Sequence, residues 1–83
     1  MKKTALVVGM AKSGVASAIL LYKKGYTVII NDLKSDIPGL SESLKKIKYV
    51  NRLGVAPEAL LDGIDLMVIS PLLPIFRPFV KES

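Results

Sequence analysis

Short apolar runs alternate with helix-like segments along the whole chain. A continuous apolar run of strand length lies at Thr4–Val8, and Tyr26–Ile30 is rich in β-branched residues. Asp65–Ile69 has an apolar core at Leu66–Ile69, and a weaker strand pattern lies at Ile47–Val50. Uninterrupted runs of this length are typical of strands that are buried on both faces of a sheet. The pattern therefore predicts strands at these places.

The segments between these runs have the spacing of helices. Apolar residues repeat with a helical period from Ser13 to Lys24, and Gly25 is a favourable place for that helix to stop. We expect shorter helices over Leu40–Lys46 and from Pro57 to Leu61, and the start of a last helix over Arg77–Ser83. Helices thus separate successive strands.

Strands that are separated by helices form right-handed crossovers and a parallel sheet. We therefore predict an α/β fold: a Rossmann-like sheet of about four strands in the order 3-2-1-4, flanked by helices. Residues 1–83 would form a single domain that stops before a fifth strand. Ligands of such sheets bind beyond the carboxyl ends of the strands. The loops Gly9–Gly14, Asn31–Ser35 and Ser70–Phe76 are expected to meet there.

Composition narrows the chemistry of the ligand. The chain has no cysteine and no histidine, which excludes disulfides, thiol chemistry and the usual zinc ligands, so no metal ligand is assigned. No apolar stretch reaches the ~20 residues of a membrane span, so we expect a cytoplasmic protein. The net charge of +5 is spread over scattered lysines, which favours a small anionic ligand over nucleic acid or a membrane. No residue stands out as a nucleophile or general base, and no catalytic residue is assigned.

The loop after the first strand has the form of a phosphate cradle. Its backbone N–H groups and the positive end of the following helix dipole would converge on an anion. It is not a Walker A loop, because no Lys-Ser/Thr pair follows Gly14. Gly9 and Gly14 fit a dinucleotide fingerprint, but Ala11 replaces its middle glycine, which keeps NAD(P) as an alternative. The ammonium group of Lys12 and the hydroxyl of Ser13 would suit a ligand with a different diphosphate group. Alternatively, the two glycines serve only to let the strand and the helix pack closely together.

The other two loops offer different groups. Asp32 ends the second strand 18 residues after Gly14, where an acid commonly accepts hydrogen bonds from a ribose or a base edge. A turn or helix-capping aspartate is the alternative. Lys34 adds a cation there or stays solvated, and Ser70 could donate to a phosphate or sugar. The apolar segment Leu72–Phe76 favours packing under a lid or another domain.

Taken together, these segments resemble the Mur ligase family, and specifically the N-terminal domain of its members that add D-glutamate. The resemblance is carried by Leu6–Ala16, Asn31–Asp32, Leu60–Leu66 and Ser70–Pro71, and it covers nearly the whole chain. It implies a Rossmann-like domain that binds the UDP part of UDP-N-acetylmuramoyl-L-alanine during peptidoglycan synthesis. It also implies a three-domain ligase in which other domains use ATP and magnesium. This domain alone would then need no cofactor and catalyse nothing.

The resemblance also implies which residues contact the substrate. Carried over by position, the diphosphate would lie against Ala11, Lys12, Ser13 and Gly14. The uracil would be held by Asp32, Leu33 and Lys34, and the sugar–diphosphate region would be bordered by Ser70, Pro71 and Leu72. Leu72 stands where the family usually has glycine.

Two other readings stay open on the residues alone. One is an NAD(P)-binding Rossmann domain of a reductase or a redox regulator. The other is a ligand-free folding or assembly unit, in which the strand at 65–69 forms an open sheet edge and pairs with a second copy. Leu72, Leu73, Ile75 and Phe76 would join that homodimer interface.

Overall fold

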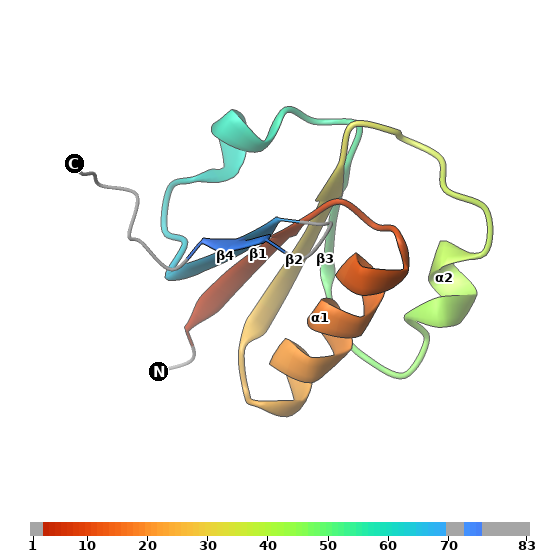
Figure 1. Ribbon diagram of the computed structural model, residues 1–83, viewed down its shortest axis with the longest axis horizontal. Coiled ribbons are helices and arrows are strands. Elements are labelled where there is room, and N and C mark those ends of the chain that lie inside the picture. Colours follow the sequence, from red (N-terminus) through yellow and green to blue (C-terminus); the bar gives the residue numbers. More distant parts are fainter. Residues whose placement is uncertain (1–2, 70–72, 76–83) are drawn as a thin grey trace.

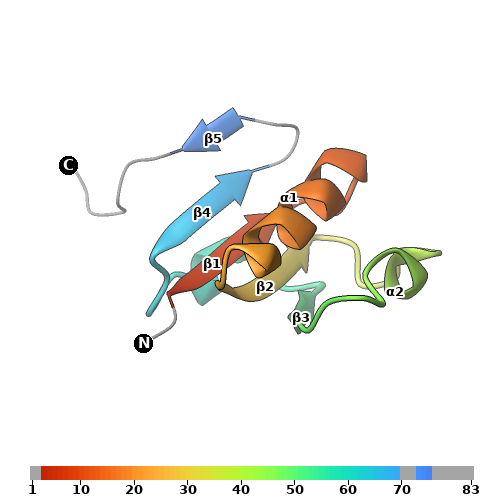
Figure 2. The ribbon, with the colours of Figure 1, turned by 90° about the horizontal axis from the view of Figure 1, so that it is seen from below.

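The computed structural model describes residues 3–69 and 73–75. Its elements, in chain order, are β1 (Thr4–Val8), α1 (Lys12–Lys23), β2 (Thr27–Asp32), α2 (Leu40–Ser43), β3 (Val50–Leu53), the 3₁₀ helix η1 (Pro57–Leu60), β4 (Leu66–Ile69) and β5 (Leu73–Ile75). They form one sheet in the order β3-β2-β1-β4-β5, as Figure 2 shows. The first four of these strands are parallel, which confirms the predicted Rossmann-like α/β arrangement.

The strand register brings the ends of β1 and β2 together. Val8, the last residue of β1, lies opposite Asn31 of β2, and Asn31 lies opposite Arg52 of β3. Because all three strands run in the same direction, the loops that follow them leave the same edge of the sheet. The predicted position of the ligand edge is therefore correct for these three strands.

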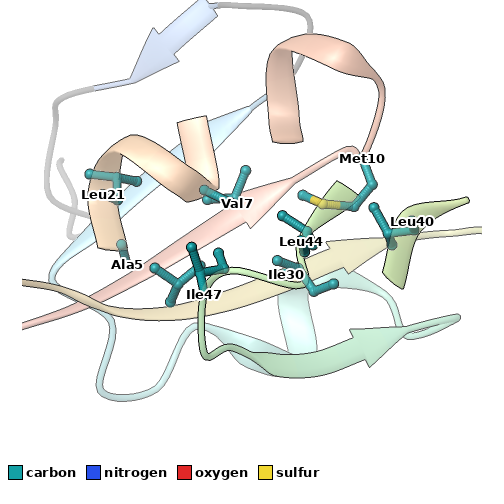
Figure 3. Packing of buried hydrophobic residues seen from close by; sticks show 10 residues of the cluster. Ala5, Val7, Met10, Leu21, Ile30, Leu40, Leu44 and Ile47 are labelled. Carbon is teal, nitrogen blue, oxygen red and sulfur yellow. The ribbon is translucent and has the colours of Figure 1, made fainter. Parts of the chain in front are cut away.

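Helices cover the two faces of the sheet (Figure 1). The core lies between the sheet and the α1–α2 side, where Val7 and Ile30 are fully buried together with Leu44, which follows α2 (Figure 3). Strand side chains alternate between faces, so Val8 points to the other side, where η1 lies. The sheet is thus enclosed most tightly where α1 crosses it.

α1 ends as its sequence predicts. Gly25 has a positive φ of 94°, and its N–H donates to the carbonyl of Tyr22 at 3.0 Å. The N–H of Tyr26 donates to the carbonyl of Leu21 at 3.0 Å, which completes a Schellman motif. This cap turns the chain directly into β2.

Two predicted boundaries are wrong. α2 ends at Ser43 rather than Lys46, and β3 covers Val50–Leu53 rather than Ile47–Val50. Ile47 is buried in the core beside Leu44 and its N–H donates to the Leu44 carbonyl at 3.1 Å. Ile47, which the pattern places at the start of a strand, therefore packs in the core on the side of the sheet that α2 covers.

The structure also has a short strand, β5, that the sequence pattern does not predict. β5 pairs antiparallel with β4, with Val68 opposite Pro74, so β4 is not the open edge expected for dimerisation. Proline has no N–H for a sheet ladder, which suits the edge position that β5 holds. The predicted site residues Ser70, Pro71 and Leu72, and the helix expected over Arg77–Ser83, lie outside the described residues. Within the described part of the chain, no helix has the length and apolar character needed to span a membrane.

Candidate functional site at the carboxyl ends of the strands

The loop between β1 and α1 is drawn tightly onto the end of β1. A Cβ atom on Gly14 would lie 1.8 Å from the carbonyl oxygen of Gly9, so no larger residue fits there. Gly9 itself has a positive φ of 93°, which glycine adopts at little cost. The close-packing role of Gly14 is therefore confirmed, and it brings the start of α1 next to the strand ends.

The N-cap residue of α1 makes no side-chain hydrogen bond to the helix. The N-cap is Ala11, in an extended conformation, and its carbonyl accepts the N–H of Val15 at 3.0 Å. The first turn holds no acidic residue, and Lys12 is its exposed first residue. Ser13 is the second residue of the helix and lies in the same turn. Such a terminus presents partial positive charge from the helix dipole together with the lysine ammonium group.

Asp32 joins the loop after β2 to the loop after β1. Its Oδ2 accepts the backbone N–H of Met10 at 2.8 Å, and its Oδ1 accepts the backbone N–H of Lys34 at 3.0 Å. The hydrogen bond from Met10, followed by the one from Lys34, lowers the pKa of this carboxyl below its ordinary value of 3.8. Asp32 is therefore ionised at neutral pH and fixes both loops, which confirms the turn role that the sequence allowed.

Asn31 is a structural residue to which the sequence analysis assigned no role of its own. Its side chain is fully buried, and its Nδ2 donates to the carbonyls of Arg52 at 2.9 Å and Val55 at 2.7 Å. Its own backbone carbonyl accepts the N–H of Gly9 at 2.7 Å. The signal that could have found it is a polar residue directly after the apolar run Val28–Ile30.

The loop after β3 also belongs to this edge. Gly54 donates its N–H to the carbonyl of Asp32 at 2.8 Å, and a Cβ atom on Gly54 would lie 2.9 Å from Cβ of Ser35. Gly54 has a positive φ of 78°. This loop therefore contacts residues 32–35 and supports them.

A hollow of about 210 Å³ opens beside the start of α1. Met10, Ala11 and Lys12 line one side of it, and residues 37–40, which lead into α2, line the other. Next to Asp32, the side chain of Leu33 is 76% exposed.

The structure thus brings two of the three predicted groups of site residues together. Residues 11–14 start α1, residues 32–34 follow β2, and the contact between Asp32 and Met10 connects them. This edge of the sheet combines the backbone N–H groups at the start of α1, the ammonium group of Lys12, the carboxylate of Asp32 and the exposed side chain of Leu33. It can hold a molecule that carries a polyanion at one end and a ring with N–H groups at the other. The described residues contain no group of three or more potential metal ligands.

Comparison with known proteins identifies the family. Residues 3–83 match the family described as Mur ligase MurD-like, N-terminal domain. A UDP-N-acetylmuramoylalanine–D-glutamate ligase of Exiguobacterium sibiricum is 38% identical over 99% of this chain and 18% of its own length. The ligase of the same name from Shouchella clausii is 46% identical over 98% of this chain and 18% of its own length.

A third ligase of that name, from Clostridioides difficile, is 39% identical over 96% of this chain and 18% of its own length. The chain therefore spans about a fifth of the length of these relatives. The match to the family covers nearly every residue, and the parallel strands have the order that the sequence pattern predicted. The chain belongs to the family of Mur ligase MurD-like N-terminal domains.

Proposed function

We propose that this chain is the UDP-binding domain of an ATP-dependent ligase that adds D-glutamate to UDP-N-acetylmuramoyl-L-alanine in cytoplasmic peptidoglycan synthesis. The observation that carries the proposal is the hydrogen bond from Met10 N–H to Asp32 Oδ2, which holds the start of α1 beside the end of β2. One ligand can therefore reach both places. The names of the relatives support UDP-linked N-acetylmuramoylalanine as the substrate class.

The diphosphate lies at the start of α1 in this proposal. The first turn has no acidic residue, and together with the exposed ammonium group of Lys12 and the adjacent hollow it suits a charged, flexible diphosphate. Gly14 contributes by removing the Cβ atom that would push the helix away from the strand. Ser13 lies in the same turn, where a hydroxyl suits a phosphate oxygen.

The uracil lies over residues 32–34. Each oxygen of an ionised carboxylate has about two acceptor sites, and Asp32 uses one on each oxygen for a backbone N–H. The remaining sites can accept the N3–H of uracil. The exposed side chain of Leu33 offers an apolar surface for the ring, and Lys34 adds a cation beside it. Ser70, Pro71 and Leu72 would complete the border on the sugar side.

ATP and magnesium act in other domains of the complete ligase in this proposal. The described residues of this chain offer no cluster of carboxylates that could hold a magnesium ion. No step of the ligation is therefore assigned to them. The role of this domain is to bind the nucleotide end of the substrate, so that the reacting carboxylate is placed in the active site formed elsewhere.

Calorimetric titration of the 83-residue chain with UDP, uridine, NAD⁺ and ATP tests this proposal. UDP is expected to bind most tightly, and uridine more weakly because it lacks the diphosphate. Lys12→Ala should weaken UDP binding and leave uridine binding unchanged. NAD⁺ binding that is tighter than UDP binding would favour the nicotinamide-binding reading instead and contradict the proposal.

A further inference from the structure

A second hollow, of about 280 Å³, lies at the opposite end of the sheet. Tyr22, Tyr26 and Tyr49 line it together with Thr27 and Lys48. We call it the tyrosine hollow. It lies where β2 and β3 begin, whereas the nucleotide edge lies where these strands end, so it is a separate place on the domain.

The three tyrosines that line the hollow each carry a hydroxyl group. All three are half-buried and pack against the core cluster. Within the described residues their hydroxyls make no hydrogen bond. A phenol hydroxyl at an interface donates readily to an oxygen acceptor while its ring stays anchored. The hollow therefore presents fixed donors.

Exposed lysines surround this hollow. Lys23 and Lys24 end α1 just before Tyr26, and Lys46 and Lys48 precede β3. Lys3 lies alongside as well, because its carbonyl accepts the N–H of Thr27 at 2.8 Å. These ammonium groups gather at one end of the molecule, although they look scattered along the sequence.

Few acidic groups balance these lysines. In the part of the chain that the structure describes, the single ion pair joins Lys45 to Glu42 at 2.8 Å. Asp65, also at this end, uses Oδ2 to accept the backbone N–H of Thr4 at 2.8 Å. The dipole of α1 accounts for a preference for lysine at 23 and 24, but Lys46 and Lys48 follow no long helix.

We propose that the tyrosine hollow and its surrounding lysines bind an acidic, extended peptide segment of a partner protein. Its carboxylates would accept hydrogen bonds from the tyrosine hydroxyls and pair with the ammonium groups, so charge and hydrogen-bonding chemistry are both complementary. Single-stranded nucleic acid fits less well, because base stacking needs free ring faces and these rings pack against the core. An anionic membrane fits less well too, because the surface is hollowed and offers no protruding apolar face.

The test is a fluorescence titration of the full 83-residue chain with a labelled octapeptide of aspartate and glutamate, at low and at physiological salt. Lys48→Glu and Arg52→Glu change the net charge equally, but Lys48 lines the hollow and Arg52 lies near the other end of β3. We expect about a tenfold loss of peptide affinity for Lys48→Glu and less than about twofold for Arg52→Glu. Tyr49→Phe, which removes only a hydroxyl, should also weaken binding, and circular dichroism checks that each variant is folded.

Equal losses for the two charge reversals would overturn the proposal, because net charge alone would then explain binding. Displacement of the peptide by UDP would also overturn it, since the peptide would then lie at the nucleotide edge. Tighter binding of a single-stranded oligonucleotide or of anionic vesicles than of the peptide would assign the surface to those partners instead. Unchanged peptide affinity at saturating UDP supports two separate sites, and this result does not depend on the proposed function.

Discussion

The carboxylate of Asp32 holds the backbone N–H of Met10 at 2.8 Å, and through this contact the end of β2 fixes the turn that starts α1. The same carboxylate also accepts the N–H of Lys34. One side chain therefore orders both loops that we propose to bind UDP. A change at this position should alter stability and ligand binding together.

Asp32→Asn should destabilise the domain by on the order of 1–3 kcal/mol at neutral pH. An amide has one oxygen, so it can accept only one of the two backbone N–H groups, and its NH₂ group would face the other. Urea denaturation measures the difference in free energy of unfolding. UDP affinity should fall as well, and unchanged affinity would remove Asp32 from the site.

The effect of Asp32 on stability should depend on pH. Its pKa is lowered in the folded chain, so the stabilisation is complete above the ordinary value of 3.8 and is lost as the pH falls through the lowered folded value. The difference between the wild-type chain and Asp32→Asn should therefore stay constant from neutral pH down to about pH 4 and shrink as the pH falls further. Denaturation curves at several pH values check this, and a difference that grows toward acid would contradict it.

Asn31→Asp should destabilise the domain strongly at neutral pH and less at acidic pH. A carboxylate there would face the carbonyl oxygens of Arg52 and Val55, and burial would raise its pKa. Protonation restores one donor, so stability should recover as the pH falls. Asn31→Leu serves as the control, because it also loses the two hydrogen bonds but introduces no titrating group. If the stability of both variants depended on pH in the same way, the result would argue against the hydrogen bonds from the Asn31 amide to the two carbonyls.

Gly14→Ala should cost roughly 1–3 kcal/mol or prevent folding, although alanine normally favours a helix. The added methyl group would meet the backbone carbonyl of Gly9 at 1.8 Å, and neither α1 nor β1 can move away cheaply. Gly25→Ala is the comparison, because nothing lies within 4 Å of its Cβ position and only the positive φ opposes the change. Thermal melts of the two variants should show the larger loss for Gly14→Ala.

Leu33→Ala should leave stability within about 0.5 kcal/mol, because this side chain is 76% exposed. In the proposed site it covers the uracil, so binding of both UDP and uridine should weaken by about fivefold, on the order of 1 kcal/mol. Calorimetry of both ligands measures this. Leu20→Ala is the matched control, because Leu20 is also exposed, at 54%, but lies on α1 away from the nucleotide edge.

Much of the fold follows from local sequence. β1 is an uninterrupted apolar run, and Gly25 can close α1 without strain, so both boundaries were predictable. Ile47 was misassigned because an apolar residue after a short helix fits a strand start equally well, and only the packing of the core distinguishes them. β5 was missed because Pro74 argues against a strand except at an edge, and an edge position is a property of the whole sheet.

The candidate site was predictable only where its residues form a local pattern in the sequence. Glycine spacing and an acid at a strand end mark the loops of Gly14 and Asp32, because both signals are local. The role of Asn31 depends on carbonyls 21 and 24 residues away, and Gly54 acts through the carbonyl of Asp32. A polar residue directly after an apolar run marks Asn31 as unusual, but its distant partners cannot be identified from the neighbouring sequence.

The most direct test of the central claim is an amide chemical-shift titration of the ¹⁵N-labelled chain with UDP. UDP should shift the amide signals of residues 10–14 and 32–34 together, with one common affinity, while those around Tyr49 stay unchanged. Asp32→Asn should reduce both groups of shifts. The absence of shifts at saturating UDP, or shifts confined to the tyrosine hollow, would contradict a UDP site at the carboxyl ends of β1 and β2.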